Sequence, residues 1–284
     1  ARRTAAGLAT VLDVEFSSFT ASSDSGDSGY SGPATLAVSP EVVRLARECG
    51  HAMTATDSGR AALARMQAPS VTVPVMLSRA RAAALRASVA EASTRADRGS
   101  GRSIGWYVGW AGEPVVSYRD AVGDAVAKLL ADRPDVRVEL VGDPDRAPGA
   151  LRRNRRVSIV SEHEPAPDSV AAWDLHVWTP CLVGREMVDD IRPLLEASSA
   201  AVPSVLPLAA RSSMDSFAGT KLVVSSFDDP EAWVAALSGL LDDAGARAGA
   251  GADARRWASA VHGSPACRMT VNRVLGWARY EVQP

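Results

Sequence analysis

The feature that most constrains the fold is a regular alternation of strand-like and helix-like segments from residue 104 onward. Short runs of branched apolar residues predict strands at 104–108, 136–141, 157–161, 175–178 and 222–224. Apolar residues at helical spacing predict helices between and after them, at 118–132, from the Asp-Asp-Pro start at 228–230, and at about 251–262 and 266–279. Such alternation favours an α/β fold, and we expect a doubly wound parallel sheet of about six strands over 104–225, with helices on both faces.

The residues before this region predict part of a second, similar domain. A hydrophobic run occupies 8–14, strands are expected at 51–56 and 71–77, and helices at 40–49 and from Asp57 or Ser58 to about Met66. A stretch rich in Ser, Gly and Asp at 16–33 predicts a polar loop. We therefore expect a partial amino-terminal Rossmann-like domain at 1–78, a helical linker at 79–103 and a carboxyl-terminal domain at 104–284.

Composition excludes several classes of function. A net charge of −2 disfavours nucleic acid as a main partner, and no apolar run reaches the length of a membrane span. The three cysteines are far apart and odd in number, so they predict neither a disulfide framework nor a metal site, and we expect a cytoplasmic protein. The four scattered histidines form no HxH or HExxH pattern, and we expect no metal.

Residues 174–206 carry the most information about function. A short strand ends in Thr179-Pro180, a Gly-Arg-Glu loop follows at 184–186, and a helix capped by Asp189 or Asp190 leads to a strand entered through Pro203. This layout presents backbone N–H groups to an anionic ligand at the carboxyl edge of a parallel sheet. Glu196 lies one to two turns into the helix, where a carboxylate could reach a ligand hydroxyl.

Two motifs in this stretch resemble GT-B glycosyltransferases of the retaining family-4 type. They are Leu195-Glu196-Ala197 and Val202-Pro203-Ser204-Val205, and weaker matches in the same order extend the resemblance over about 40–280. The resemblance implies a GT-B-like fold and a hexosyltransferase that uses a nucleoside diphosphate sugar, without a metal or other cofactor. The acceptor would be a glycan or lipid-linked molecule, as in bacterial cell-envelope polysaccharide synthesis. A complete family member needs roughly another hundred residues at the amino end, so we expect a fragment that binds donor weakly and transfers poorly.

By this resemblance, Glu196 would bind both ribose hydroxyls of the donor. The alternative is a solvent-facing helix residue or the partner of a nearby arginine. We expect Glu196→Ala to weaken nucleotide binding and to leave stability almost unchanged. The family's second glutamate would lie eight positions earlier, but that position is Val188, so Glu186 is the substitute, with Gly184 and Arg185 beside it. Glu186 and Arg185 are the catalytic candidates.

The remaining candidates lie after the predicted strands. Arg185 and Arg192 are the candidates for diphosphate binding, because a guanidinium binds phosphate oxygens in two-pronged fashion; the alternative for each is a surface ion pair. Gly109 and Gly112 form a turn that could approach a phosphate or the sugar, although such a turn is more often structural. The family contacts the base after the third strand, which makes Ser161 and Glu162 candidates there.

Two further interpretations stay open at this stage. A cluster of arginines could contact anionic lipid heads at the inner face of the membrane or form a solvated loop; its members are Arg152, Arg153, Arg155 and Arg156. The alternative function is a degenerate nucleotide-binding or scaffolding protein without turnover, which the broken glutamate spacing and the missing Arg/Lys pair favour. A dehydrogenase or epimerase is disfavoured because no dinucleotide fingerprint is present.

Overall fold

The computed structural model describes most of the chain between residues 10 and 272. The described residues are 10–14, 19–22, 35–38, 40–54, 57–68, 70–72, 77–94, 101–110, 118–162, 164–180, 182–183, 186–187, 191–207, 223–224, 226, 228–261, 263, 265, 269–270 and 272. The chain divides into two compact units. Unit 1 comprises 1–76, 182–190 and 261–284, and unit 2 comprises 77–181 and 191–260.

Unit 2 is built on a six-stranded sheet in which all neighbouring strands are parallel. Its strands are β6 (Arg102–Gly109), β7 (Val136–Gly142), β8 (Val157–Val160), β9 (Leu175–Val177), β12 (Ser204–Pro207) and β13 (Val223–Val224). Their spatial order is β13-β12-β9-β6-β7-β8, so β6, the first of these six strands in the sequence, lies at the centre and the chain winds outward in both directions. This is the strand order of a doubly wound, Rossmann-like sheet, and it confirms the predicted fold class.

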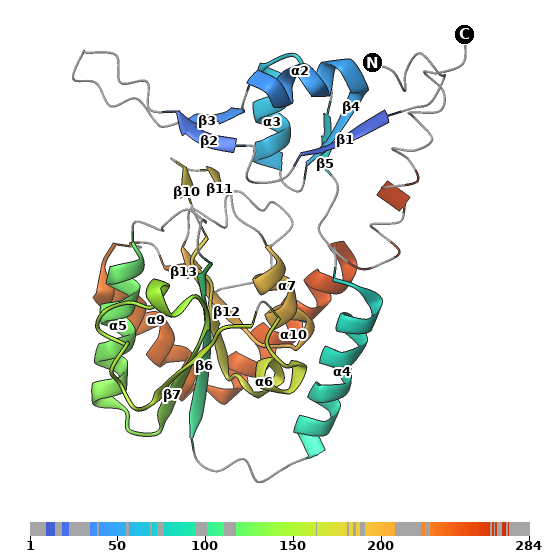
Figure 1. Cartoon of the computed structure of the whole chain (residues 1–284). Coiled ribbons are helices and arrows are strands. Elements are labelled where there is room, and N and C mark those ends of the chain that lie inside the picture. Colours follow the sequence, from blue (N-terminus) through green and yellow to red (C-terminus); the bar gives the residue numbers. More distant parts are fainter. Residues whose placement is uncertain are drawn as a thin grey trace, which may run out of the picture. The chain divides into compact units, whose positions relative to one another are not determined.

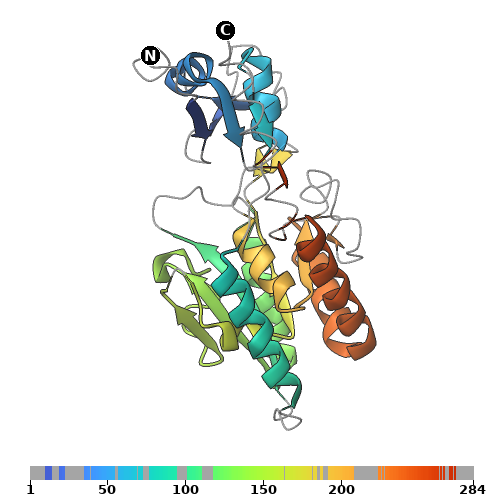
Figure 2. The same cartoon turned by 90° about the vertical axis from the view of Figure 1, so that its right-hand side faces the viewer.

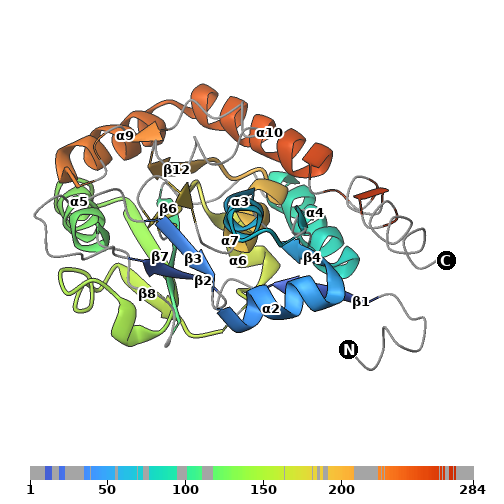
Figure 3. The same ribbon diagram turned by 90° about the horizontal axis from the view of Figure 1, so that it is seen from above.

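Helices cover both faces of this sheet (Figures 1 and 3). Helix α5 (Arg119–Asp132) packs against α9 (Pro230–Asp242) on one face. On the other face, α4 (Arg79–Thr94), α6 (Pro167–Ala172) and α7 (Arg192–Ser199) pack against one another. A short 3-10 helix (Pro144–Arg146) follows β7, and α10 (Ala244–Val261) follows α9. The two central strands, β6 and β9, are buried over most of 104–108 and over 175–177, because helices cover both faces of the sheet there.

Unit 1 contains a smaller parallel sheet. Its strands β1 (Thr10–Val14), β4 (Gly50–Thr54) and β5 (Ser70–Thr72) lie in that order, with helices α2 (Pro40–Cys49) and α3 (Asp57–Arg65) between them in the chain. The predicted polar loop was wrong in part. Residues Phe19–Ser22 form strand β2, which pairs antiparallel with β3 (Thr35–Val38), because backbone pairing does not require apolar side chains. A second small hairpin pairs β10 (Leu182–Val183) with β11 (Glu186–Met187).

Two predicted boundaries differ from the structure. The first part of the expected linker is α4, a helix of 16 residues that belongs to unit 2, and β6 begins at Arg102, inside the linker's predicted end. Helix α7 begins at Arg192 after Ile191, which makes no side-chain capping bond, rather than directly after Asp189 or Asp190. Those two aspartates lie outside the described residues. In the part of the chain that is described, no helix is long and apolar enough to span a membrane.

Candidate functional site

The chain changes direction between the two central strands of unit 2. From β6 the chain proceeds outward to β7 and β8, whereas from β9 it proceeds the other way to β12 and β13. The connections that follow these two neighbouring strands therefore diverge at the carboxyl edge of the sheet, the edge at which doubly wound α/β folds generally bind ligands. Gly109 and Val177 are the last residues of the two strands.

Close backbone packing shapes the carboxyl ends of β6 and β7. Gly109 has a φ of +86°, and its carbonyl oxygen accepts a hydrogen bond of 2.9 Å from the Asp143 N–H. Gly142 has a φ of +143°, and a Cβ atom there would lie 2.5 Å from the Gly109 oxygen. Gly109 thus has a structural reason to be glycine, and its predicted contact with the donor stays a prediction.

The segment that follows β9 is held by side chains from β6 and from the residue that precedes α5. Trp106 donates a hydrogen bond of 2.9 Å from Nε1 to Thr179 Oγ1, and Tyr118 donates one of 2.6 Å from its hydroxyl to the Pro180 carbonyl. Tyr118 also lies parallel to the Trp233 ring, with 6.5 Å between ring centroids. The Thr179-Pro180 segment is therefore fixed at the edge of the sheet although it has no regular structure.

Two helices begin at this edge, and each begins with an arginine. Helix α5 follows β6 and starts at Arg119, and α7 follows β9 and starts at Arg192. Arg119 Nε lies 3.8 Å from Asp120 Oδ1, and among the described residues this nitrogen is buried without a hydrogen-bond partner. A cation at a helix N-terminus is disfavoured by the helix dipole, while an anion there is stabilised. An anion near the N-termini of both α5 and α7 would thus make the positions of Arg119 and Arg192 favourable.

Glu196 lies in α7 and is held by residues from two other elements. Its Oε1 accepts a hydrogen bond of 2.9 Å from Arg81 Nε, and its Oε2 accepts bonds of 2.9 Å from Arg81 Nη2 and 2.7 Å from the Tyr107 hydroxyl. Arg81 comes from the first turn of α4 and Tyr107 from β6. Figure 2 shows α4 running beside α7, and the ion pair between Arg81 and Glu196 links these two helices. The structure thus makes Glu196 the partner of an arginine, the alternative that the sequence left open.

The charges of this triad follow from its burial. The side chains of Arg81 and Glu196 are only 10% and 8% exposed. Burial by itself lowers the pKa of Arg81, but the hydrogen bond and the charge of Glu196 outweigh it, so the net pKa is raised. Burial, followed by the charge and hydrogen bond of Glu196, raises the pKa of Tyr107. Arg81 therefore stays charged and Tyr107 stays a neutral donor.

This geometry overturns the expectation that Glu196→Ala would leave stability unchanged. Glu196 is 6% exposed and joins α7 to α4 and β6 through three hydrogen bonds. Removing the carboxylate would leave the Arg81 guanidinium buried without its acidic partner, which is a costly state. The predicted role in ribose binding is a separate matter and stays a prediction.

The rings of Trp173 and His176 pack against Tyr107, the residue that donates to Glu196. The ring of His176 stacks on Trp173 with 6.0 Å between centroids and meets Tyr107 edge-on at 5.7 Å. A Cβ atom on Gly105 would lie 2.1 Å from the Trp173 ring, so glycine lets that ring lie against β6. His176 Nδ1 lies 2.9 Å from Ser204 Oγ, and burial lowers the pKa of His176 to about 3. His176 is thus a buried, structural histidine.

The other predicted site residues lie in unit 2, in unit 1 or outside the described residues. Ser161 and Glu162 follow β8 and are both exposed, and Arg192 is exposed at the start of α7. Glu186 begins β11 in the small hairpin of unit 1. Gly112, Gly184 and Arg185 lie outside the described residues.

The arginine cluster has a structural use for two of its members. Arg152 donates hydrogen bonds to the carbonyls of Ala147 and Asp145, and Arg156 donates to the carbonyls of Arg133 and Leu130 near the end of α5. The Leu130 carbonyl lies in the last turn of α5, where carbonyl groups lack an acceptor role within the helix and side chains such as Arg156 can bind them. Arg153 and Arg155 are exposed.

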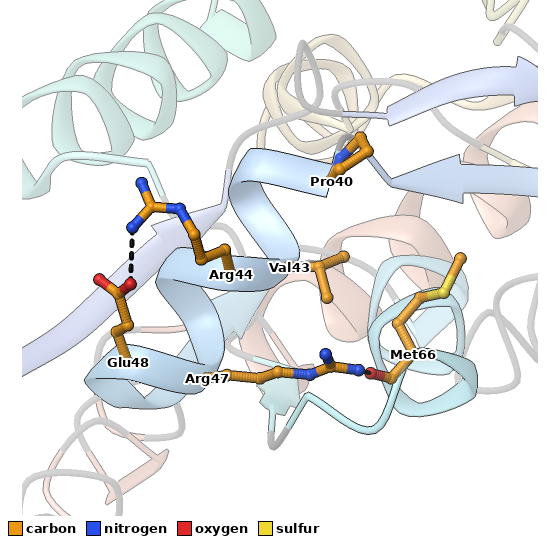
Figure 4. Close-up of a pocket in the computed structure, with 6 residues that line it drawn as sticks. All are labelled: Pro40, Val43, Arg44, Arg47, Glu48 and Met66. Atoms are coloured by element: carbon orange, nitrogen blue, oxygen red, sulfur yellow. Dashed lines mark hydrogen bonds and ion pairs between the residues drawn. The ribbon is translucent and has the colours of Figure 1, made fainter.

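Unit 1 contains a shallow pocket of about 430 Å³ (Figure 4). Its walls are α2 and the residue after α3, and its lining comprises Pro40, Val43, Arg44, Arg47, Glu48 and Met66. The two arginines of the lining make contacts within unit 1. Arg44 pairs with Glu48 at 2.6 Å, and Arg47 donates to the Met66 carbonyl. We assign no ligand to this pocket.

Arg81 and Tyr107 were not among the residues predicted for the site. Arg81 belongs to an Ala- and Arg-rich stretch that predicted a linker, and Tyr107 reads as one residue of an apolar strand. The useful signal was the polar hydroxyl of Tyr107 within a strand expected to be buried, since such a group requires a partner. Groups of acidic residues, histidines and cysteines that could hold a metal are absent from the described part of the chain.

Comparison with known proteins identifies the fold. No protein-family model matches the chain, and no curated protein is similar to it in sequence. Among solved structures, Anabaena Alr3699/HepE in complex with UDP and glucose is 14% identical with a TM-score of 0.65, over 96% of this chain and 73% of that one. WaaG, a glycosyltransferase of lipopolysaccharide biosynthesis, is 16% identical with a TM-score of 0.55, over 79% of this chain and 62% of WaaG.

A third similar structure is the sucrose-phosphate synthase of Thermosynechococcus elongatus. It is 16% identical with a TM-score of 0.57, over 84% of this chain and 62% of that one. The chain thus spans 62% to 73% of the length of these three proteins. The expected resemblance is confirmed at the level of structure, and the chain has an α/β fold similar to that of GT-B glycosyltransferases.

Proposed function

We propose that this chain binds a nucleoside diphosphate sugar at the carboxyl edge of the unit 2 sheet and takes part in glycosyl transfer. The observation that carries the proposal is the pair of arginines, Arg119 and Arg192, at the first positions of the two helices that begin there. Together with the helix dipoles they form an electropositive edge that suits a diphosphate. The bound UDP of Anabaena Alr3699/HepE supports the same class of ligand.

The proposed reaction moves a sugar from the donor to a glycan or lipid-linked acceptor, with retention at the anomeric carbon. The protein would position the donor and stabilise the departing diphosphate with helix-terminal N–H groups and arginines. In this proposal Gly109 and Gly112 approach the phosphates or the sugar, Ser161 and Glu162 lie on the base side, and Glu196 binds the ribose. Gly184, Arg185 and Glu186 are proposed for the sugar and the catalytic step.

The chemistry proposed here requires no metal or other cofactor. The proposed place of action is the cytoplasm, with contact at the inner face of the membrane if the acceptor is lipid-linked. Exposed Arg153 and Arg155 are the described members of the arginine cluster that could meet anionic head groups there.

The test measures nucleotide affinity by titration calorimetry with UDP, GDP and ADP. Each of Arg119→Ala and Arg192→Ala should weaken binding of the tightest of the three by roughly 10-fold or more, the usual cost of losing a charge-assisted hydrogen bond. The matched control is Arg137→Ala, which removes an exposed arginine near the amino end of β7, at the opposite edge of the same sheet. Equal losses in all three variants, or no binding by the unaltered chain, would contradict the proposal.

One observation favours a second candidate, nucleotide binding or scaffolding without turnover. Three hydrogen bonds from Arg81 and Tyr107 already occupy the Glu196 carboxylate, which leaves it little capacity for a donor. Nucleotide binding without release of UDP from a UDP-sugar, by this chain and by a longer chain extended at its amino end, would select this candidate.

A further inference from the structure

Strand β8 is an edge strand of the unit 2 sheet. Among the described strands it pairs only with β7, so it ends the sheet on that side (Figure 3). Its residues are incompletely covered, since Ser158 is exposed and Val157, Ile159 and Val160 are partly exposed. An edge strand of this kind carries backbone N–H and C=O groups with which another chain can pair.

The pairing with β7 shows which backbone groups of β8 point outward. The Val138 N–H of β7 donates a hydrogen bond of 2.9 Å to the Arg156 carbonyl, so the polar groups of Arg156 face β7. Alternate residues of a strand direct these groups to opposite sides, so those of Val157 and Ile159 face away from β7. The Val157 N–H donates to the Asn154 carbonyl at 3.0 Å. Ile159 therefore presents both its N–H and its C=O at the edge.

The charges at the two ends of β8 have opposite signs. Exposed Arg153 and Arg155 precede the strand, and exposed Glu162 and Glu164 follow it. Charges of one sign along an edge would repel an identical strand in either direction. With opposite signs at the two ends, an identical strand is repelled when it lies parallel and attracted when it lies antiparallel. The surroundings of β8 thus contain both halves of a complementary charge pattern.

We propose that β8 pairs antiparallel with β8 of a second copy of this chain, so that two unit 2 sheets join into one. A two-fold axis requires this direction and presents the same surface on both copies. With Ile159 opposite Ile159 of the second copy, the outward N–H and C=O groups of the two residues pair with each other. The basic end of each strand then lies beside the acidic end of the other. The inference goes beyond the proposed function and does not depend on nucleotide binding.

The strength of this association is limited by the length of the edge. Strand β8 has four residues, whereas specific interfaces commonly bury about 1,200–2,000 Å². We therefore expect a dimer with a dissociation constant of about 1 µM or weaker. Its attraction between exposed charges is screened by salt, since the Debye length falls from about 10 Å at 0.1 M to about 3 Å at 1 M. The dimer should dissociate as salt is raised over this range.

The experiment measures self-association of the whole chain by sedimentation velocity over a range of protein concentrations. Arg155→Glu and Glu162→Arg should each weaken it by roughly 10-fold or more, because the two-fold axis places like charges together at both ends of the interface. The double variant should return to within about 3-fold of the unaltered chain, since opposite charges face each other again. An equimolar mixture of the two single variants should form mixed dimers for the same reason.

A backbone variant tests the strand pairing itself. Ile159→Pro removes an N–H that points away from β7, so unit 2 should keep its fold while the dimer is lost. The control is Arg86→Glu, which makes the same charge change at an exposed position of α4 and should leave self-association unaltered. If Ile159→Pro does not fold, the charge variants and their mixture still report on the interface.

Several results would overturn the inference. They are a monomer at every concentration, single charge variants that associate like the unaltered chain, and an Ile159→Pro variant that still dimerises. A fourth is a monomer whose binding to phosphatidylglycerol vesicles is abolished by Arg155→Glu, since that result would assign the arginines to lipid head groups instead. None of these measurements uses a nucleotide, so their outcome is separate from the test of the proposed function.

Discussion

Replacing Glu196 by alanine is the sharpest test of how unit 2 is held together. The carboxylate joins α7 to α4 and β6, and its two partners lie 115 and 89 residues away in the sequence. The substitution removes all three hydrogen bonds at once. It also leaves the Arg81 guanidinium, only 10% exposed, with a hydrogen bond to the Pro165 carbonyl but without its acidic partner. We therefore expect a large loss of stability, not a surface effect.

The magnitude follows from the burial of the pair. Breaking a buried ion pair by removing one partner costs about 3–5 kcal/mol, whereas an exposed pair is worth about 0–1 kcal/mol. With the size of unit 2, a loss of about 3–5 kcal/mol corresponds to a fall in melting temperature of about 6–20 °C. Glu196→Gln should cost less than Glu196→Ala, because the amide oxygen can still accept a hydrogen bond and the side-chain volume is kept.

Urea unfolding followed by tryptophan fluorescence is the appropriate assay. The chain has seven tryptophans, and all except Trp277 belong to unit 2, so the signal reports mainly on that unit. A double-mutant cycle with Arg81→Ala separates the pair from its surroundings. The double variant should be more stable than the sum of the two single losses predicts, because neither charge is then left buried alone.

The matched comparison is Lys128→Ala, which breaks an exposed pair with Glu231 between α5 and α9. It should cost at most about 1 kcal/mol. If Glu196→Ala costs no more than Lys128→Ala, the carboxylate does not hold α7, α4 and β6 together as described.

Two further predictions concern stability. The pKa of His176 is lowered by burial to about 3, from an ordinary value near 6.5, so below pH 6.5 the unfolded chain binds a proton that the folded chain does not. This contribution is fully present above pH 6.5 and is lost as the pH falls toward 3. The loss amounts to about 2 kcal/mol at pH 5, relative to pH values above 6.5, and urea unfolding of His176→Phe should not show this loss. Gly142→Ala should destabilise the protein by about 2 kcal/mol or more, because φ is +143° and the new Cβ atom would meet the Gly109 oxygen; a melting temperature equal to that of the unaltered chain would contradict this.

Much of the fold could be predicted from local pattern alone. The segments predicted as strands at 104–108 and 136–141 form β6 and β7, and the helical stripe predicted at 118–132 forms α5. Such segments can be recognised because a buried strand is rich in branched apolar residues, and a packed helix is apolar on one side. Strand β2 was not predicted, because its pairing with β3 relies on backbone hydrogen bonds, and these require no particular side-chain pattern in the sequence.

The candidate site could be predicted from local pattern only in part. The motif around Glu196 pointed to the correct helix and to a fold that the solved structures share. It did not show that Glu196 is held by Arg81, since nothing local links a residue in a predicted linker to one 115 positions later. Periodicity reports which side of an element is buried, and it contains no information about which distant element lies against that side.

The sequence by itself determined that unit 2 is a parallel α/β sheet, because the alternation of buried strands and one-sided helices admits few other arrangements. Only the tertiary structure decided the order β13-β12-β9-β6-β7-β8, and with it the place where Arg119 and Arg192 meet one edge of the sheet. It also decided that the Glu196 carboxylate is largely occupied by Arg81 and Tyr107. The physical reason is that strand order and side-chain partners are set by packing between segments far apart in the chain, whereas strand and helix formation is set largely within each segment.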